Sequence, residues 1–202
     1  SRKEDIMIRE LLPLTKRKMK ILLAIYLWEN LHNSRIAQIS GLDKQNVSLH
    51  MKKLKKDGIV EVSNKIGKIT EYSLNKKFIE VFSVILNDYR KDLIYSNYPY
   101  IQKVSQYLIN NAKIEKLYLI GSYAQNSANQ QSDMDFVIVS KKASARQVNN
   151  LSDKVFKLYK IKVDVLIYSP KSLEKERKSN SVFYRTTFTH KKDHLLLFKE
   201  ER

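Results

Sequence analysis

Three aspartates have the residue type and the spacing to form a cation site. Asp133 and Asp135 stand two residues apart, directly before the apolar run 136–139, and Asp164 lies inside the apolar segment 163–168. Because residues i and i+2 of a strand point to the same face, Asp133 and Asp135 can present two carboxylates together. Like charges at that distance repel, so an ionised pair favours a cation between them, and Mg²⁺ prefers such oxygen ligands. A third carboxylate on a neighbouring strand would complete a site for phosphoryl or nucleotidyl transfer.

The segments around these aspartates resemble the nucleotidyltransferase superfamily of DNA polymerase beta, in particular its minimal and kanamycin-type members. The resemblance rests on the segments Gly121-Ser122-Tyr123-Ala124, Ser132-Asp133-Met134-Asp135-Phe136 and Val163-Asp164-Val165. It implies that Asp133, Asp135 and Asp164 are catalytic and hold one or two Mg²⁺ ions. It also implies that Gly121 and Ser122 bind the phosphates of a nucleoside triphosphate. Asp164 would bind the second metal or accept the proton of the attacking hydroxyl.

One pair of residues departs from the family pattern. Where the family has Arg-Gly after the Ala, this chain has Gln125-Asn126. Asn tolerates a left-handed backbone better than most residues, so we expect the turn to form.

The composition sets outer limits. The 202 residues contain no cysteine, which excludes disulfides and thiolate chemistry, and the formal net charge is +17. A charge of this size favours nucleic acid as a partner, although a lysine-rich composition of the source would produce the same value. No apolar run reaches membrane-spanning length and the first residues lack the core of a signal peptide, so a soluble cytoplasmic protein without membrane contact is expected.

The first third of the chain reads as three helices followed by a hairpin. Thr15, Ser34 and Asp43 are the predicted N-caps, and Gly41 and Gly58 end the second and third helices. Segments 59–62 and 69–74 read as strands joined by the loop 63–68. This order resembles the winged helix-turn-helix of multiple-antibiotic-resistance and archaeal regulators.

The winged-helix resemblance implies a DNA-reading surface. Its second motif helix would enter the major groove, and lysines in the later part of that helix and on the wing would contact phosphates. DNA is the expected partner, with RNA as an alternative, and packing or dimerisation through this domain stays open. The predicted DNA-binding residues are Lys44, Gln45, Asn46, Ser48, His50, Lys52, Lys53, Lys56, Lys65 and Lys68.

A helical segment separates the two parts. Apolar residues at 78, 82, 85 and 89 recur at helical spacing, and Pro99 marks a break before a second helix over 100–111. We therefore predict a winged helix over 1–75, a helical connector over 76–96 and a nucleotidyltransferase domain over 97–202. The fold class is α+β, and the last domain is a mixed sheet with flanking helices, including helices over 143–160 and 171–178 and a closing strand over 194–198.

Two functions fit this organisation. In the first, the chain is an Mg²⁺-dependent nucleotidyltransferase that transfers a nucleoside monophosphate, and its winged helix binds DNA. In the second, it is a DNA-binding transcriptional regulator whose nucleotidyltransferase-like domain senses a nucleotide or dimerises without catalysis. A protein acceptor or an antitoxin-type partner is a further option. Because winged-helix proteins are commonly dimeric, the resemblance also suggests a homodimer.

Overall fold

The computed structural model describes residues 14–129 and 131–200. The chain divides into two compact units between Leu86 and Asn87. Segment 1–13, the start of the predicted winged helix, and residue 130 in the loop before Asp133 lie outside the described residues. None of the helices in the described part of the chain is long and apolar enough to cross a membrane.

From residue 14 onward, the first unit is described as three helices and a short strand before the wing. Thr15 and Asp43 cap the first and third helices as predicted, and Gly41 ends the second in the left-handed conformation. The predicted Ser34 cap is wrong, because the ring of His32 accepts the hydrogen bond from the Arg35 amide at 3.3 Å and the helix begins two residues earlier, at Asn33. The elements are α2 (Lys16–Trp28), β1 (Leu31–His32), α3 (Asn33–Ser40) and α4 (Lys44–Lys56).

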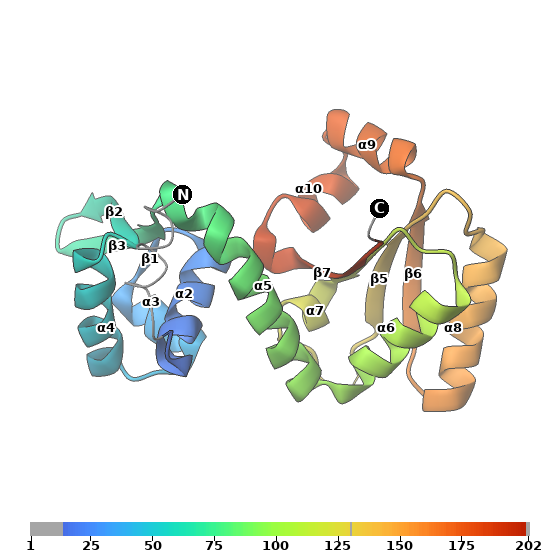
Figure 1. Ribbon diagram of the computed structural model, residues 1–202, viewed down its shortest axis with the longest axis horizontal. Helices are drawn as coiled ribbons and strands as arrows, with labels where there is room; N and C mark the ends of the chain where they lie inside the picture. Colours follow the sequence, from blue (N-terminus) through green and yellow to red (C-terminus); the bar gives the residue numbers. More distant parts are fainter. Residues whose placement is uncertain (1–13, 130, 201–202) are drawn as a thin grey trace, which may run out of the picture. The chain divides into compact units, whose positions relative to one another are not determined.

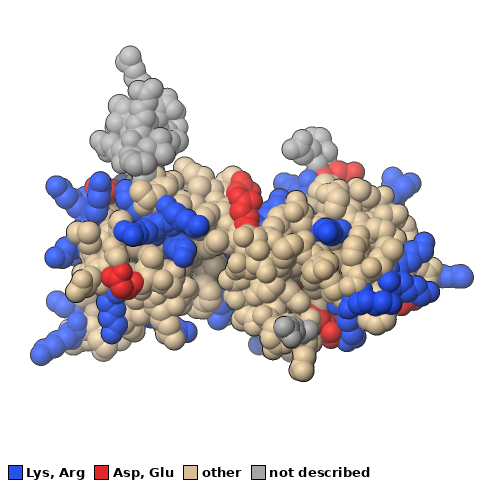
Figure 2. Space-filling view, turned by 90° about the horizontal axis from the view of Figure 1, so that it is seen from below, with Lys and Arg blue, Asp and Glu red and all other residues tan. Residues whose placement is uncertain are grey.

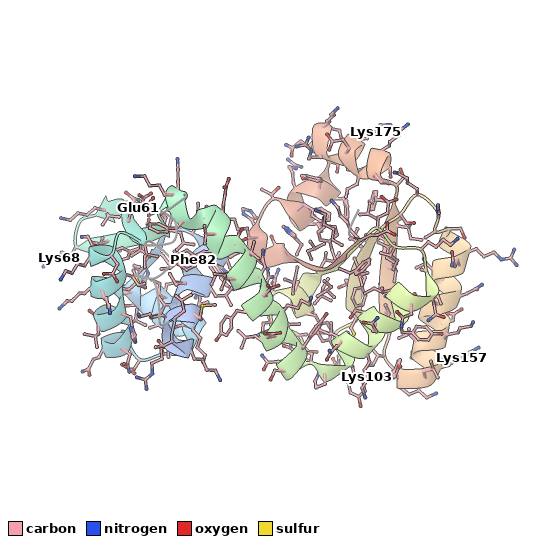
Figure 3. All side chains as sticks on the ribbon, in the orientation of Figure 1. Glu61, Lys68, Phe82, Lys103, Lys157 and Lys175 are labelled. Carbon is pink, nitrogen blue, oxygen red and sulfur yellow. The ribbon has the colours of Figure 1, made fainter. Side chains whose placement is uncertain are left out.

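The wing is a longer hairpin than the sequence indicates. Strands β2 (Val60–Ile66) and β3 (Ile69–Leu74) pair antiparallel, and the predicted loop 63–68 is mostly strand that turns only at Gly67 and Lys68. Strand β1 pairs with the other edge of β3, giving the order β1-β3-β2. Figure 3 shows Lys68 projecting outward at the tip of this hairpin.

Helix α5 (Lys76–Asn97) covers the segment that was predicted as a connector, and it is continuous over 22 residues. Within the first unit, Phe78, Phe82 and Leu86 are its buried residues. Their spacing is i, i+4, i+8, whereas Ile85, expected on the apolar face, is 39% exposed. The buried residues of this part of the helix therefore recur every four residues, whereas the sequence pattern predicted alternating spacings of four and three.

The second unit is a four-stranded mixed sheet with flanking helices. The strand order is β6-β5-β4-β7, with β5 parallel to β6 and the other pairs antiparallel. The predicted α+β architecture is confirmed. The elements are α6 (Pro99–Asn111), β4 (Lys116–Ile120), α7 (Gly121–Ala124), β5 (Met134–Val139), α8 (Ala145–Tyr159), β6 (Val163–Tyr168), α9 (Pro170–Lys178), α10 (Val182–Phe188), a 3-10 turn η1 (Lys191–Asp193) and β7 (His194–Lys199).

One face of this sheet forms the apolar core. Helices α6 and α8 lie against it (Figure 1), and side chains such as Leu108, Phe136 and Val148 are fully buried there. Leu158 of α8 is 61% exposed. It lies on the last turn of the helix, beyond the buried residue Val155.

The other face carries an aromatic layer beneath α10, a helix that the sequence reading did not predict. The ring of Phe183 stacks on Tyr168 of β6 with centroids 5.0 Å apart, and Phe188 meets Tyr118 of β4 edge-on at 5.2 Å. The aromatic residues of α10 recur without a clean helical periodicity. These rings cover one part of this face. Its polar part lies at the start of β5 and β6, where the strands carry aspartates.

Candidate functional site

The sheet register brings the three predicted aspartates together. Asp135 of β5 is the direct partner of Asp164 in the parallel strand β6, and Asp133 immediately precedes β5. Asp133 and Asp135 are two residues apart and share a face with Asp164. The structure therefore gathers the three carboxylates that the sequence singled out at one edge of the sheet.

A glycine makes room for one of these carboxylates. Gly121 has φ +68°, and a Cβ added to it would lie 2.7 Å from Oδ2 of Asp135. Any other residue would collide with the carboxylate as well as strain the backbone. Gly121 is thus required both for the turn from β4 into α7 and for the close approach of Asp135.

Helix α7 is fixed by contacts below the Gly-Ser turn. The hydroxyl of the buried Tyr123 donates to the Ser132 carbonyl at 3.3 Å, which ties α7 to the residue before Asp133. Burial, together with nearby Tyr98 and Asp133, raises the pKa of Tyr123 above its ordinary value, so the phenol keeps its proton. Tyr123 therefore positions the loop and does not face a substrate.

A buried arginine anchors the same helix. Arg90 of α5 is 3% exposed, and its guanidinium donates to the carbonyl of Ala124 at 2.7 Å. It also donates to the carbonyls of Lys191, Lys192 and His194 at 2.7 to 2.9 Å. The charged fork joins the end of α7 to the loop before β7. Sequence reasoning missed this residue, because a lone arginine on an amphipathic helix gives no signal of burial.

The residues that depart from the family pattern form an ordered turn. Asn126 adopts φ +57°, as the sequence predicted for the turn, and its side-chain oxygen accepts from Asn97 at 2.9 Å. The Gln125 amide donates to Asp193 at 2.9 Å. Gln125 is thereby directed toward the η1 turn and takes part in holding α7.

The carboxylate cluster has one tethered cation. Burial, then the like charges of Asp164 and Asp133, raise the pKa of Asp135, and Lys162 opposes this shift. The Lys162 ammonium lies 2.6 Å from Oδ2 of Asp133 and 3.6 Å from Oδ2 of Asp164. Its hydrogen bond to Asp133, followed by the charges of Asp133 and Asp164, raises the pKa of Lys162. The site thus favours positive charge.

The donor set matches a hard divalent cation in chemistry. Carboxylate oxygens are the ligands that Mg²⁺ takes, and it usually keeps waters and substrate phosphates as further ligands. In the part of the chain that the structure describes, no group of three His, Cys, Asp or Glu residues is arranged so that it could hold a metal ion. The carboxylates face one region of space, but Asp133 is engaged by Lys162.

A hollow beside the cluster offers space for a substrate. Its volume is 810 Å³, and its lining includes Lys162 and Asp164 together with Phe156 and Leu166. Both apolar side chains are about half exposed, at 51% and 46%. The hollow combines a charged end at the carboxylates with an apolar wall from α8 and β6.

The predicted DNA-reading residues lie mostly on the exposed side of the first unit. On α4, Gln45, Lys52 and Lys56 project opposite the buried Val47 and Met51. Lys44 and Lys53 are exposed beside this row, Ser48 and His50 are half-buried, and Lys65 and Lys68 are exposed on the wing. The Asn46 amide group bonds to the Asp43 side chain, so this residue serves the helix cap.

Three further residues belong to this surface although sequence reasoning did not place them there. Leu49 is 66% exposed and lies on the row of Gln45 and Lys52. Burial, followed by the charges of Lys18, Arg17 and Lys53, lowers the pKa of His50. Arg17 and Lys18 of α2 therefore extend the positive surface of α4. Figure 2 shows Lys and Arg side chains on both units, on the face drawn.

Comparison with protein families identifies both parts of the chain. The family "Polymerase beta, Nucleotidyltransferase" matches residues 102–186, and "Winged helix-turn-helix DNA-binding" matches residues 14–61. The chain thus combines a winged helix-turn-helix DNA-binding domain with a nucleotidyltransferase-like domain of the polymerase beta family. A comparison with curated proteins found no match.

Solved structures resemble parts of the chain at low identity. A predicted DNA-binding transcriptional regulator from E. coli is 14% identical, covers 43% of this chain and 88% of its own, and has a TM-score of 0.37. A toxin-antitoxin crystallised with AMP-PNP is 20% identical over 50% of this chain and 73% of its own, with a TM-score of 0.38. The archaeal chromatin protein TrmBL2 is 14% identical over 90% and 77%, with a TM-score of 0.26. These likenesses lie below a TM-score of 0.5 and carry no functional argument.

Proposed function

We propose that the protein is a Mg²⁺-dependent nucleotidyltransferase whose winged helix binds DNA. The observation that carries this proposal is the pairing of Asp135 with Asp164 in register, with Asp133 on the same face and Gly121 making room for the Asp135 carboxylate. Three carboxylates on one face cost electrostatic free energy in the absence of a bound cation. Such an arrangement is expected where a cation and a polyphosphate bind.

Each residue has a role in the proposed reaction. Asp133, Asp135 and Asp164 would hold Mg²⁺, which, when bound, neutralises the phosphates and supports in-line displacement. Asp164, the most exposed of the three in its side chain at 60%, would accept the proton of the acceptor hydroxyl. Ser122 and the backbone amides after Gly121 would bind the terminal phosphates. The acceptor would enter through the hollow beside Lys162 and Asp164.

Calorimetry tests nucleotide binding directly. Each of the four ribonucleoside triphosphates is titrated with Mg²⁺ into wild type, Asp135→Asn and the control Asp88→Asn, which alters an exposed carboxylate in the same unit. We expect binding in wild type and the control, and its loss in Asp135→Asn and without Mg²⁺. Equal nucleotide binding by Asp135→Asn and wild type would show that Asp135 does not take part in the nucleotide site. No nucleotide binding by wild type would contradict the proposal.

DNA binding by the winged helix has its own test. Lys52, Lys53 and Lys56 are replaced together by Gln, and the control carries Lys154→Gln and Lys157→Gln on α8. Each lost phosphate contact should reduce the slope of log K against log salt by about 0.9. The control should keep the wild-type slope. An unchanged slope in the α4 variant would show that this helix does not contact the nucleic acid backbone.

A second function, a regulator without catalysis, is favoured by one observation. The Lys162 ammonium lies against Asp133, so the carboxylates are not closed around a cation position. In this case the nucleotidyltransferase-like domain would sense a nucleotide or dimerise, and the DNA-binding domain would carry the output. Nucleotide binding that changes DNA affinity without any release of pyrophosphate would support the regulator. Pyrophosphate release that Asp135→Asn abolishes would support the enzyme.

A further inference from the structure

Lys162 occupies a defined position in the sheet. Met134 pairs with Val163 in the parallel ladder, so Lys162, one residue earlier, lies beside Asp133. The Met134 amide donates to the Lys162 carbonyl at 3.0 Å, which fixes this alignment. Because side chains alternate between faces, Asp133, Asp135, Lys162 and Asp164 form a square of four charged groups on one face.

The ammonium is placed where a cation would be needed. Its nitrogen lies 2.6 Å from Oδ2 of Asp133 and 3.6 Å from Oδ2 of Asp164, so one positive charge bridges carboxylates from both strands. An oxygen that accepts such a short hydrogen bond cannot also bind Mg²⁺ at about 2.1 Å without driving the two cations together. The ammonium and a metal ion at Asp133 therefore exclude one another.

The Lys162 side chain is also free to move its ammonium away from the carboxylates. Its side chain is 62% exposed, and four rotatable methylene bonds allow the head to swing into water. An exposed ion pair is weak, because water solvates the ammonium almost as well as the carboxylate does. Lys162 can therefore neutralise the cluster without locking it.

We propose that Lys162 is a tethered counter-ion that holds Asp133 and Asp164 together in the metal-free protein and competes with the divalent cation for them. This inference rests on the proposed metal site. Lys162 is a positioning residue: it lowers the repulsion among the three carboxylates before a cation arrives, and reduces the apparent affinity for that cation. Metal binding then requires displacement of the ammonium, so that the site keeps its shape at low metal concentration and fills only when the cation is abundant.

Metal binding to the full chain tests the proposal independently of activity. Mn²⁺, which takes similar oxygen ligands, is titrated without nucleotide into wild type, Lys162→Gln, Lys162→Met, Lys162→Arg and the control Lys154→Met. Lys154 is an exposed lysine of α8 in the same unit. Removal of the competing charge should tighten Mn²⁺ binding by about two- to fivefold in the Gln and Met variants. Lys162→Arg and Lys154→Met should bind as wild type does.

Thermal unfolding in EDTA supplies the second readout. Lys162→Gln and Lys162→Met should unfold at a lower temperature than wild type in EDTA and recover most of the difference with saturating Mn²⁺, because the metal replaces the missing charge. Mn²⁺ affinity that is unchanged or weaker in both variants overturns the competition. If wild type binds Mn²⁺ but the variants gain nothing, only this inference fails. If none of the proteins binds Mn²⁺, both the proposed metal site and this inference are wrong.

Discussion

Removing one carboxylate from the cluster should stabilise the metal-free protein. Asp135 is half-buried, and the pKa of its carboxyl is raised by burial and by the neighbouring Asp164 and Asp133. The native fold therefore disfavours the ionised form that Asp135 takes at neutral pH. Asp135→Asn removes that charge and keeps the shape of the side chain, so we expect the free energy of unfolding to rise.

The size of the gain follows from the strand geometry. Side chains of paired residues on adjacent strands lie about 5 Å apart, where two like charges repel by about 2 to 3 kcal/mol at an effective dielectric constant of 20 to 40. Lys162 offsets part of this repulsion and water screens the exposed side of Asp135, which leaves on the order of 1 kcal/mol. For a unit of this size that corresponds to a rise in Tm of about 3 to 6 °C.

Calorimetric melting in EDTA and in Mg²⁺ measures the effect on the second unit. In EDTA at pH 7 the variant should melt above wild type, and Asp88→Asn should change nothing. The gain should shrink as the pH falls through the raised pKa of Asp135, because the wild-type carboxyl then takes up a proton and loses its repulsion. Saturating Mg²⁺ should stabilise wild type and Asp88→Asn but not Asp135→Asn. A lower Tm for Asp135→Asn in EDTA would refute the repulsion argument.

Three further predictions concern the residues around the cluster. Gly121→Ala should lower the free energy of unfolding in urea by about 1 to 2 kcal/mol, because φ is positive and the new Cβ would meet the Asp135 carboxylate at 2.7 Å. The substitution should also weaken Mg²⁺ binding. A variant as stable as wild type would contradict this reasoning. Arg90→Met should lower the free energy of unfolding by about 3 kcal/mol, because main-chain carbonyls lose a charged donor. Urea unfolding measures this change. A loss below about 1 kcal/mol would show that water replaces the guanidinium. Burial, followed by the charge of Arg90, lowers the pKa of His194, so its contribution to stability is complete above its unfolded pKa of about 6.5 and is lost as the pH falls below that value. Melting between pH 7.5 and 5 should show a smaller loss for His194→Gln than for wild type, and equal slopes would exclude His194.

Much of the fold could be predicted because the sequence states it locally. Thr15 and Asp43 mark helix starts through local hydrogen bonds from backbone amides to their side chains, and the proline at 99 marks the start of α6. The apolar runs of β4 and β5 are recognisable because these are the central strands of the sheet, and β6 is recognisable from its run of β-branched and apolar residues. The aspartate cluster could be predicted as well, because alternation in strands and a resemblance to a known family agreed on the same residues.

What could not be predicted depends on contacts between distant segments. Helix α10 packs aromatic side chains on the sheet without a simple apolar period. The burial of Arg90 depends on carbonyls more than thirty residues away, and Leu49 is exposed because the helix turns it opposite Val47 and Met51. Lys162 looked like one more lysine in a basic chain, and only the pairing of β5 with β6 sets it beside Asp133.

The anchoring of α7 by Arg90 affects how the sequence can vary. The acceptors named for its guanidinium are peptide carbonyls of Ala124, Lys191, Lys192 and His194, and every amino acid supplies the same carbonyl. The hydrogen bonds to Arg90 therefore place no requirement on the side chains at those four positions. The arginine itself has no such freedom, because no exchange at a partner position can restore its donors. Among relatives we expect an arginine that is kept without any compensating change elsewhere.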